Sequence, residues 1–392
     1  MTAPDAAAPG VAAPGAVRVL YLAGSGRSGS TLLTTILGQL AGFFAAGELR
    51  YLWQRGVLEN RPCGCGLPVN DCPFWSAVRR ELPADNAAGI ADRLRTRLRL
   101  RGLPALLRRH RRGRPAVAGH PDDRVIADLY AALARHAALA EAPGPARHSG
   151  PAGGSGPARH SGPAGAPGAA RHPGPAEGSG PTAGLADAPG PVIVDSSKLP
   201  PYGALLGTLP GIDLRVLHLV RDPRGTAFSW RRRRGLDGRG DGRLMSRPPV
   251  WKAALLWLVW NGAAGRLWAR GDSGRYLRIR YEDFVADPER VIRRIAGFAG
   301  MSPARLPFTP AGQVLLAPTH SVAGNPSRHR VGPVPITDDD EWIWAMPTWS
   351  YALVTLISVP LLRRLGYPLR RPGPMRSDRH PGRMRADRYE ED

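Results

Sequence analysis

The residues with the most distinctive chemistry lie in a glycine-rich loop close to the start of the chain. The loop reads Gly24-Ser25-Gly26-Arg27-Ser28-Gly29-Ser30-Thr31, between the apolar run Val17–Leu22 and a leucine-rich segment that ends at Leu40. This order is typical of a strand, a tight loop and a helix. Glycines allow successive backbone N–H groups to turn inward, and the following helix directs its positive end to the same point. The segment therefore predicts a binding site for an oxyanion.

The cation of this loop is not where a nucleotide triphosphatase has it. Such a loop reads G-x-x-x-x-G-K-[ST], with its lysine on the terminal phosphates and its hydroxyl on magnesium. Gly24 and Gly29 keep that spacing, but Ser30 stands at the lysine position and Arg27 lies inside the loop. We therefore expect a terminal group that needs no metal. A sulfuryl group fits, because it carries less charge than a terminal phosphoryl group.

A second basic position follows another predicted strand. Arg221 comes directly after the apolar run Leu214–Val220, and Ser229 lies about two turns farther along a helix predicted over Arg224–Arg233. The guanidinium of Arg221 is a forked donor, and Ser229 can reach the same anion. Two anion sites on one sheet edge imply a doubly phosphorylated nucleotide.

Short apolar strands that alternate with helices predict an α/β fold, with a parallel sheet covered by helices on both faces. The ligand is then expected at the carboxyl ends of the strands. Two segments, Asp92–Arg114 and Asp123–Ala140, are expected to form a helical excursion from the sheet. Further strands are predicted over Val192–Val194 and Tyr276–Ile279, and further helices over Gly203–Leu209, Val250–Arg270 and Glu289–Gly300.

These motifs resemble those of the sulfotransferases that use 3′-phosphoadenosine-5′-phosphosulfate (PAPS). The segment Arg27–Thr31 is similar to their loop for the 5′-phosphosulfate, and Leu217–Arg224 with Ser229 is similar to their 3′-phosphate motif. Arg280–Phe284 resembles a late strand-end motif, and Gly324–Arg328 resembles the loop that closes over the nucleotide. The resemblance covers most of the chain outside the insertion and the tails, and it implies a P-loop NTPase-like fold.

The resemblance also implies an activity, the transfer of the sulfuryl group from PAPS to a hydroxyl acceptor. Adenosine 3′,5′-bisphosphate is released, and no metal is required. The acceptor is a carbohydrate, a peptide tyrosine, a lipid or a secondary metabolite, and the sequence does not choose among them. The residues that the resemblance implies for binding the donor are Arg27, Ser28, Gly29, Ser30, Thr31, Arg221, Ser229 and Arg328.

Two further residues are predicted to be catalytic. Glu48 follows the loop at the separation found in tyrosylprotein sulfotransferases, which this region resembles, and it is expected to take the proton of the acceptor hydroxyl. Many cytosolic members use a histidine near the position of Lys198, and this chain has none there. Lys198 is expected to stabilise the charge on the departing phosphate. The alternatives are that Glu48 pairs with Arg50 and that Lys198 covers the edge of the sheet.

The three cysteines of the chain, Cys63, Cys65 and Cys72, lie close together in the sequence. Three thiolates can hold zinc with a fourth ligand from elsewhere, although the paired C-x-x-C spacing of many zinc sites is missing. One disulfide with a free thiol, or three reduced structural cysteines, are the alternatives, and the sequence assigns none of them to a metal. Similar cysteine-rich segments in bacterial members of the family imply a structural role near the acceptor.

The chain is strongly basic, with a formal net charge of +22 over 392 residues, and Lys198 and Lys252 are its only lysines. Such a charge attracts polyanions and is compatible with peripheral contact with anionic surfaces. Aromatic residues are not interleaved with the basic runs, so nucleic-acid binding is not expected. The sequence shows no secretory signal and no apolar run long enough to span a bilayer. We therefore expect a cytoplasmic protein.

Two other functions are compatible with an anion-binding loop. One is a phosphotransferase that uses ATP and magnesium, with Asp195 as a strand-end metal ligand, although the loop lacks the lysine of such enzymes. The other is a non-catalytic protein that binds polyanions.

The predicted domain is interrupted by a low-complexity segment. Residues 17–142 are expected to form its first part and residues 192–368 its second part. Residues 143–191 form a repetitive insertion rich in glycine and proline, which cannot fold by itself. Residues 1–16 and 369–392 are predicted to be disordered tails.

Overall fold

The computed structural model describes residues 15–83, 86–114, 119–141, 190–232, 247–271 and 273–371. The two predicted tails and the insertion over residues 143–191 lie almost wholly outside these residues.

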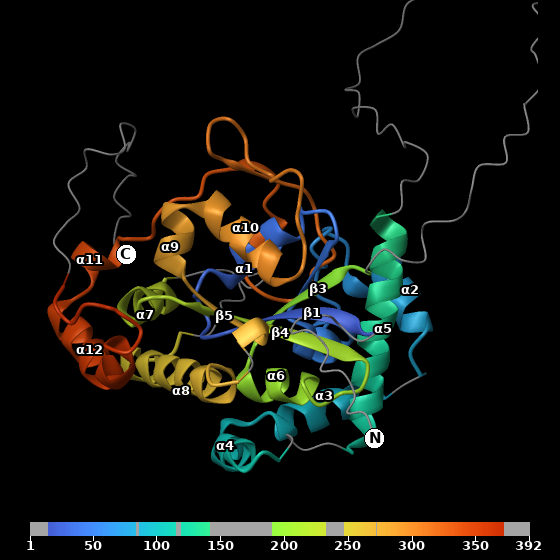
Figure 1. The fold of residues 1–392 in the computed structure, drawn as a ribbon, viewed down its shortest axis with the longest axis horizontal. Coiled ribbons are helices and arrows are strands. Elements are labelled where there is room, and N and C mark those ends of the chain that lie inside the picture. Colours follow the sequence, from blue (N-terminus) through green and yellow to red (C-terminus); the bar gives the residue numbers. More distant parts are fainter. Residues whose placement is uncertain are drawn as a thin grey trace, which may run out of the picture.

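The centre of the described chain is a sheet of five parallel strands in the order β2-β3-β1-β4-β5 (Figure 1). β1, β3 and β4 are buried along most of their length, as strands covered on both faces must be. The predicted α/β fold with a parallel sheet is confirmed. The strands are β1 (Val17–Ala23), β2 (Phe43–Gly47), β3 (Val192–Lys198), β4 (Ile212–Val220) and β5 (Tyr276–Arg280).

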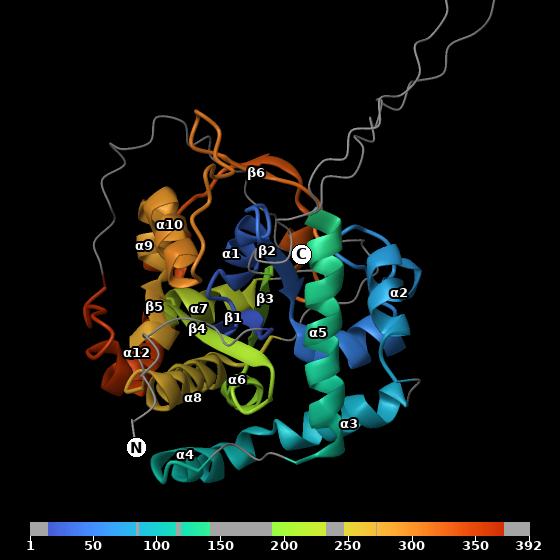
Figure 2. The ribbon, with the colours of Figure 1, turned by 45° about the vertical axis from the view of Figure 1, so that its right-hand side comes forward.

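Helices cover both faces of this sheet (Figures 1 and 2). On one face, Leu20 and Leu22 of β1 share a core with α1 (Ser30–Leu37) and α10 (Pro288–Phe298). On the other face, Tyr21 belongs to a core that includes side chains of α5, α6 and α8. These three helices are α5 (Pro121–Glu141), α6 (Pro200–Leu206) and α8 (Val250–Trp268).

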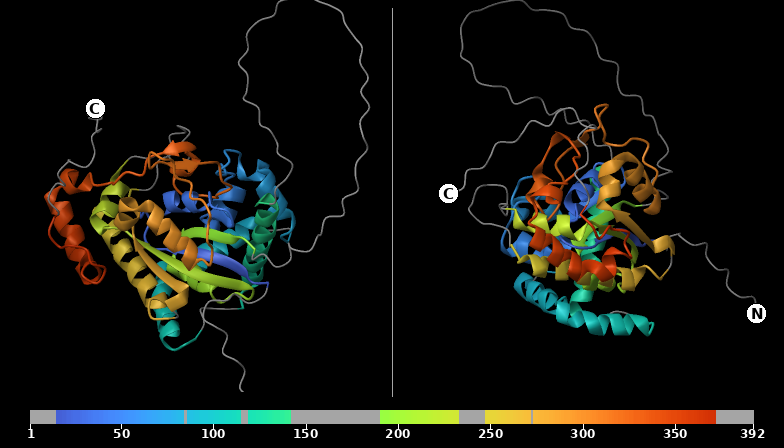
Figure 3. Two further views of the ribbon diagram at one scale, coloured as in Figure 1. Left: turned by 45° about the horizontal axis from the view of Figure 1, so that its top comes forward. Right: turned by 90° about the vertical axis from the view of Figure 1, so that its left-hand side faces the viewer.

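The predicted helical excursion lies outside these layers. α4 (Leu103–Arg111) packs on α8, and α3 (Ala87–Arg97) contacts the segment Leu52–Leu58; both lie at the lower edge of the view in Figure 1, and Figure 3 shows the same ribbon from two other sides. Among the described residues, no helix has both the length and the apolar character needed to cross a bilayer. The remaining elements are α2 (Pro73–Arg80), α7 (Pro223–Arg231), α9 (Tyr281–Ala286), α11 (Trp342–Ala345), α12 (Thr348–Leu362) and the antiparallel strands β6 (Val314–Leu316) and β7 (Gly332–Val334).

Two elements differ from the sequence-based expectation. β2 was not predicted, because its short sequence is mostly alanine and glycine after two phenylalanines. β3 continues past Val194 to Lys198, through polar residues that are all buried. Burial of Asp195 and Ser197 is tolerated because they bond to each other: Ser197 donates to Asp195 Oδ1 through its backbone N–H at 2.7 Å and its hydroxyl at 2.6 Å.

Arg224 connects the C-terminal part of the chain to the sheet. Its fully buried guanidinium bonds to both carboxylate oxygens of Asp222, at 2.8 and 2.6 Å, and to Tyr351 Oη at 2.6 Å. It also donates to the carbonyl oxygen of Pro368 at 2.9 Å. A single buried cation therefore holds α7, α12 and the segment that follows α12.

We expect Arg224→Met to lower the free energy of unfolding by about 3 to 5 kcal/mol, because Asp222 would keep a buried carboxylate without its cation. Urea denaturation measures the change. Arg95→Met is the matched control, since the Arg95 side chain is 73% exposed in its pair with Asp92 and should contribute less than about 1 kcal/mol. Similar small losses in both variants would contradict the assignment.

Candidate active site

A cavity of about 460 Å³ lies where the parallel strands end. Its walls come from the glycine loop after β1, the segment after β2, the end of β3, α7 after β4, and the chain between β6 and α11. The volume is within the range of pockets that hold small ligands. The place agrees with the expectation that the ligand binds at the carboxyl ends of the strands.

The glycine loop forms one wall of the cavity. Gly24 and Gly29 have φ angles of 136° and 86°, which favour glycine. A Cβ at Gly24 would lie 2.4 Å from the carbonyl oxygen of Leu219, and one at Gly29 would lie 2.5 Å from the ring of Tyr281. The backbone can therefore follow this path only without side chains at these two positions.

The loop leaves the start of α1 open to an anion. Gly29 is the N-cap residue of α1, and no side chain caps the helix there. Gly29, Ser30 and Thr31 line the cavity, as does Arg27, whose guanidinium lies 5.0 Å from the ring centre of Trp230. Ser28 is buried and is not part of the cavity wall. Backbone donors and one cation thus converge at this end of the cavity.

Glu48 and Lys198 meet in a second wall. Glu48 directly follows β2 and Lys198 ends β3, which pairs with β2 in the sheet. Lys198 Nζ lies 2.5 Å from Glu48 Oε1 and 2.9 Å from the carbonyl oxygen of Ser196. Lys198 has a φ angle of 67°, which is unusual for a residue with a side chain. Such strain is found where the surrounding structure fixes a side chain in place.

The charge of Glu48 is set by two opposing effects. Burial would raise the pKa of Glu48, but Lys198 and Arg50 beside it outweigh burial, so the pKa lies below its usual value. Arg50 itself donates to the carbonyl oxygen of Ser197 at 3.2 Å. Glu48 is therefore an ionised carboxylate, only 13% exposed, whose direct partner is Lys198.

Arg221 forms a second cationic site in the same cavity. Its guanidinium pairs with Asp339 at 2.8 Å and lies 4.5 Å from the ring centre of Tyr281. Arg232 pairs with the same carboxylate at 2.9 Å. Burial would raise the pKa of Asp339, but these two arginines hold it below its usual value. Ser229 lines the cavity as well, so two guanidinium groups and a hydroxyl are available to one anion.

Arg328 does not line the cavity, although it was expected to contact phosphate. Its buried guanidinium donates to the carbonyl oxygens of Pro62, at 2.9 Å, and Gly324, at 3.2 Å. The neighbouring Arg330 lines the cavity instead, together with Arg55. No motif in the sequence distinguishes these two arginines from the many others, because only the path of the chain brings them to the cavity.

Asp195 lies away from the cavity. It is fully buried, and its two carboxylate oxygens accept hydrogen bonds from Ser197 and from Tyr130 Oη. Burial raises the pKa of Asp195 to about 6. A strand-end magnesium ligand, as the phosphotransferase hypothesis requires, would need these oxygens to face the nucleotide.

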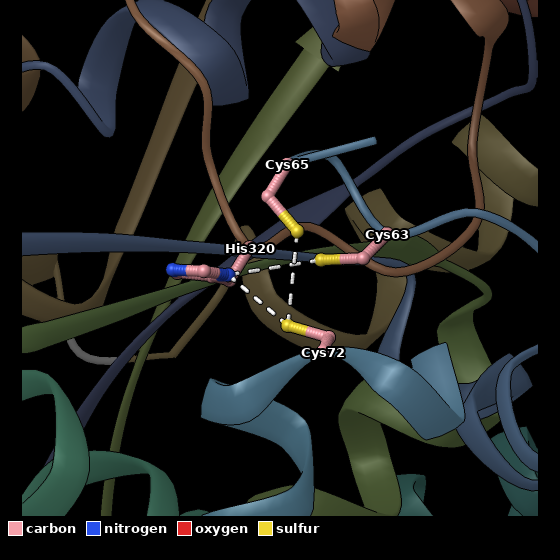
Figure 4. A group of neighbouring side chains, drawn as sticks. All are labelled: Cys63, Cys65, Cys72 and His320. Atoms are coloured by element: carbon pink, nitrogen blue, oxygen red, sulfur yellow. Dashed lines mark hydrogen bonds between the residues drawn. The ribbon is translucent and has the colours of Figure 1, made fainter. Parts of the chain in front are cut away.

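The three cysteines lie together beside a histidine that sequence reasoning missed (Figure 4). None of the cysteines is in a disulfide. The fourth side chain, His320, comes from the segment after β6, and 248 positions separate it from Cys72. Spacing along the chain gave no signal for this residue. We call this group the Cys3His cluster; its members are Cys63, Cys65, Cys72 and His320.

Comparison with known proteins identifies one family. The sequence profile described as the sulfotransferase family matches residues 20–304. No curated protein sequence matches the chain.

Solved structures similar to this chain are bacterial or biosynthetic sulfotransferase domains. The sulfotransferase domain of the curacin biosynthetic pathway is 17% identical, with a TM-score of 0.45, and the match covers 90% of this chain and 99% of that one. The sulfotransferase domain of the Synechococcus PCC 7002 olefin synthase is 18% identical, with a TM-score of 0.46, and 92% and 99% are covered. A sulfotransferase from Alicyclobacillus acidocaldarius is 12% identical, with a TM-score of 0.35, and 91% and 98% are covered.

We expect Lys198→Met to raise the pKa of Glu48 from its lowered wild-type value, because burial remains while the nearest cation is removed. In the wild type, the lowered pKa contributes stability above pH 4.5 that is lost as the pH falls through the folded-state pKa. In the variant this contribution is smaller, because only Arg50 and Arg55 then oppose the effect of burial on the pKa of Glu48. The difference in free energy of unfolding between wild type and variant should therefore grow from acid to neutral pH.

Urea denaturation at a series of pH values measures this difference. Lys252→Met is the control, because Lys252 is the only other lysine and is exposed. Its difference from the wild type should not change with pH. A constant difference for Lys198→Met as well would contradict the ion pair.

Proposed function

Because this chain belongs to the sulfotransferase family, we propose that it transfers the sulfuryl group of PAPS to an acceptor hydroxyl and releases adenosine 3′,5′-bisphosphate. The observation that carries the proposal is that two anion sites, the glycine loop and the Arg221 site, open into one cavity. A nucleotide with an anionic group at each end would engage both. Family membership supports the same donor.

In this proposal the glycine loop and Arg27 bind the 5′-phosphosulfate, while Arg221 and Ser229 bind the 3′-phosphate. Asp339 supports the second assignment, because its carboxylate already lies between the guanidinium groups of Arg221 and Arg232. A phosphate can replace a carboxylate at such forked donors. We therefore infer that the donor displaces Asp339 from these arginines when it binds.

The ion pair between Glu48 and Lys198 suggests how donor binding prepares the reaction. Lys198 has an anionic alternative to Glu48 once the phosphosulfate is present, namely the oxygen that bridges phosphorus and sulfur. When Lys198 turns to that oxygen, Glu48 loses its main cation, and burial then raises its pKa toward that of a useful base. The carboxylate thus gains proton affinity only when the donor is bound.

The transfer step then involves one proton and one sulfuryl group. Glu48 takes the proton of the acceptor hydroxyl as its oxygen attacks sulfur, and the bond from sulfur to the bridging oxygen breaks. Negative charge builds on the departing phosphate, and Lys198 stabilises it; the loss of one such donor typically costs about 2.7 to 4 kcal/mol.

The two alternative functions predict different results. A phosphotransferase would need magnesium and would prefer ATP, whereas a non-catalytic polyanion binder would bind ADP as well as adenosine 3′,5′-bisphosphate. Donor turnover without added magnesium, measured as release of the bisphosphate from PAPS, excludes the first. Calorimetric titration with both nucleotides tests the second.

We expect Glu48→Gln to abolish turnover while it leaves the affinity for adenosine 3′,5′-bisphosphate nearly unchanged, because the amide cannot accept the proton. Single-turnover assays with PAPS and calorimetry measure the two quantities. The control is Glu59→Gln, an exposed carboxylate farther along the same segment, which should keep full activity. Full turnover in Glu48→Gln would rule out its role as the base.

We expect Arg221→Met to weaken the binding of adenosine 3′,5′-bisphosphate by about 10- to 100-fold, the value of one charge-assisted hydrogen bond. Binding of ADP, which has no 3′-phosphate, should change little. Asp339→Asn should strengthen bisphosphate binding, because the competing carboxylate loses its charge. Equal losses for both nucleotides in Arg221→Met would contradict the assignment of the 3′-phosphate site.

A further inference from the structure

We propose that the Cys3His cluster binds one zinc ion in a closed structural site. This inference does not rest on the proposed function, because it follows from ligand type and geometry alone. The four ligand atoms lie within 4.8 Å of one another, and they come from two segments far apart in the sequence (Figure 4).

Three of the six distances between ligand atoms are close to those of a tetrahedral zinc site, and the other three are no longer than 4.8 Å. Bonds of about 2.3 Å to sulfur and about 2.0 Å to nitrogen imply edges of roughly 3.8 Å between sulfurs and roughly 3.5 Å between sulfur and nitrogen. The Sγ atoms of Cys65 and Cys72 are 3.7 Å apart. His320 Nδ1 lies 3.4 Å from Cys72 Sγ and 3.8 Å from Cys63 Sγ. A disulfide would need sulfurs about 2.0 Å apart.

The chemistry of the donors favours zinc over other metals. Thiolates and imidazole are the ligands of structural zinc sites, whereas magnesium and calcium prefer oxygen. Three cysteines and one histidine complete a coordination number of four, so no position is left for water or substrate. The site would therefore hold the fold and take no part in sulfuryl transfer.

The surroundings of the cluster fix its ligands in place. The ring of Phe74 is stacked on His320 at 4.9 Å with an angle of 11° between the planes. Trp75 Nε1 donates to the carbonyl oxygen of His320 at 2.9 Å, and Gly64 N–H donates to the carbonyl oxygen of Ser321 at 2.9 Å. The Cys segment and the His320 segment are thus joined by hydrogen bonds independently of a metal.

Arg328 bonds to the backbone of the segment that carries Cys63, and its positive charge has the sign that would balance the loaded site. On binding, the three thiols release their protons to solvent, so zinc with three thiolates and a neutral imidazole carries a net charge of −1. The buried guanidinium of Arg328 bonds to the carbonyl oxygen of Pro62, the residue before Cys63. This gives Arg328 a structural role at the metal site.

The zinc site would fix the wall of the cavity that contains Glu48. Val322 lies two residues after His320, and its backbone bonds to the residues on both sides of Gly47. Glu48 N–H donates to the carbonyl oxygen of Val322 at 2.8 Å, and Val322 N–H donates to the carbonyl oxygen of Ala46 at 2.9 Å. Gly324 follows in the cavity wall. Zinc would therefore clamp the end of β2 against the segment after β6, much as a cross-link closes a long loop.

The first test is metal content of the full chain purified without a histidine tag. We expect one zinc ion per chain by elemental mass spectrometry. After removal of zinc under reducing conditions, cobalt(II) should give the intense visible bands of a tetrahedral site and a thiolate-to-cobalt charge-transfer band. Zinc should abolish both by displacement. Absence of zinc together with absence of these bands in the folded protein would overturn the proposal.

The second test uses variants of the ligands. Cys72→Ser and His320→Ala should weaken zinc binding by more than the 10- to 100-fold typical of losing a group that only hydrogen-bonds a ligand. His110→Gln, an exposed histidine on α4, is the control and should retain one zinc ion per chain. If a ligand variant does not fold, the cobalt spectrum of the wild type still decides the question. Full zinc affinity in Cys72→Ser would overturn the assignment.

Discussion

The parallel pairing of β2, β3, β1 and β4 is the constraint on which the cavity depends. Because these strands run in one direction, their carboxyl ends meet at one edge of the sheet, and four separate pieces of sequence reach the cavity there. The residues after β1 form the glycine loop, and those after β2 and at the end of β3 form the ion pair of Glu48 and Lys198. The residue after β4 is Arg221.

The buried cations of the cavity wall are paired with carboxylates. A chain with a net charge of +22 must compensate the cations that it buries, and the two buried cations among the described residues of the cavity wall each have an acidic partner. Lys198 has Glu48, and Arg221 has Asp339. These partners are carboxylates that an anionic nucleotide could replace without leaving the cations uncompensated.

The segment between β6 and α11 forms part of the cavity wall, although it is far from the glycine loop in the sequence. Val322 pairs with the end of β2, Gly324 and Arg330 lie in the cavity wall, and Asp339 reaches the two arginines near α7. This segment contains little helix or strand, so contacts with other parts of the chain must hold it in place. Arg328, and zinc at the Cys3His cluster in our proposal, would provide them.

The sequence by itself determined the parallel α/β fold, the glycine loop between β1 and α1, and Arg221 as a basic strand end, because local spacing of glycines, apolar runs and cations encodes them directly. It also singled out Glu48, Lys198 and the three cysteines, but it left their partners open. Only the tertiary structure paired Glu48 with Lys198, bonded Arg328 to the backbone of Pro62, and placed His320 beside cysteines that are at least 248 positions away from it. The reason is physical: contacts between distant segments depend on how strands order themselves in the sheet and on the path of irregular chain, and neither leaves a periodic signal in the sequence.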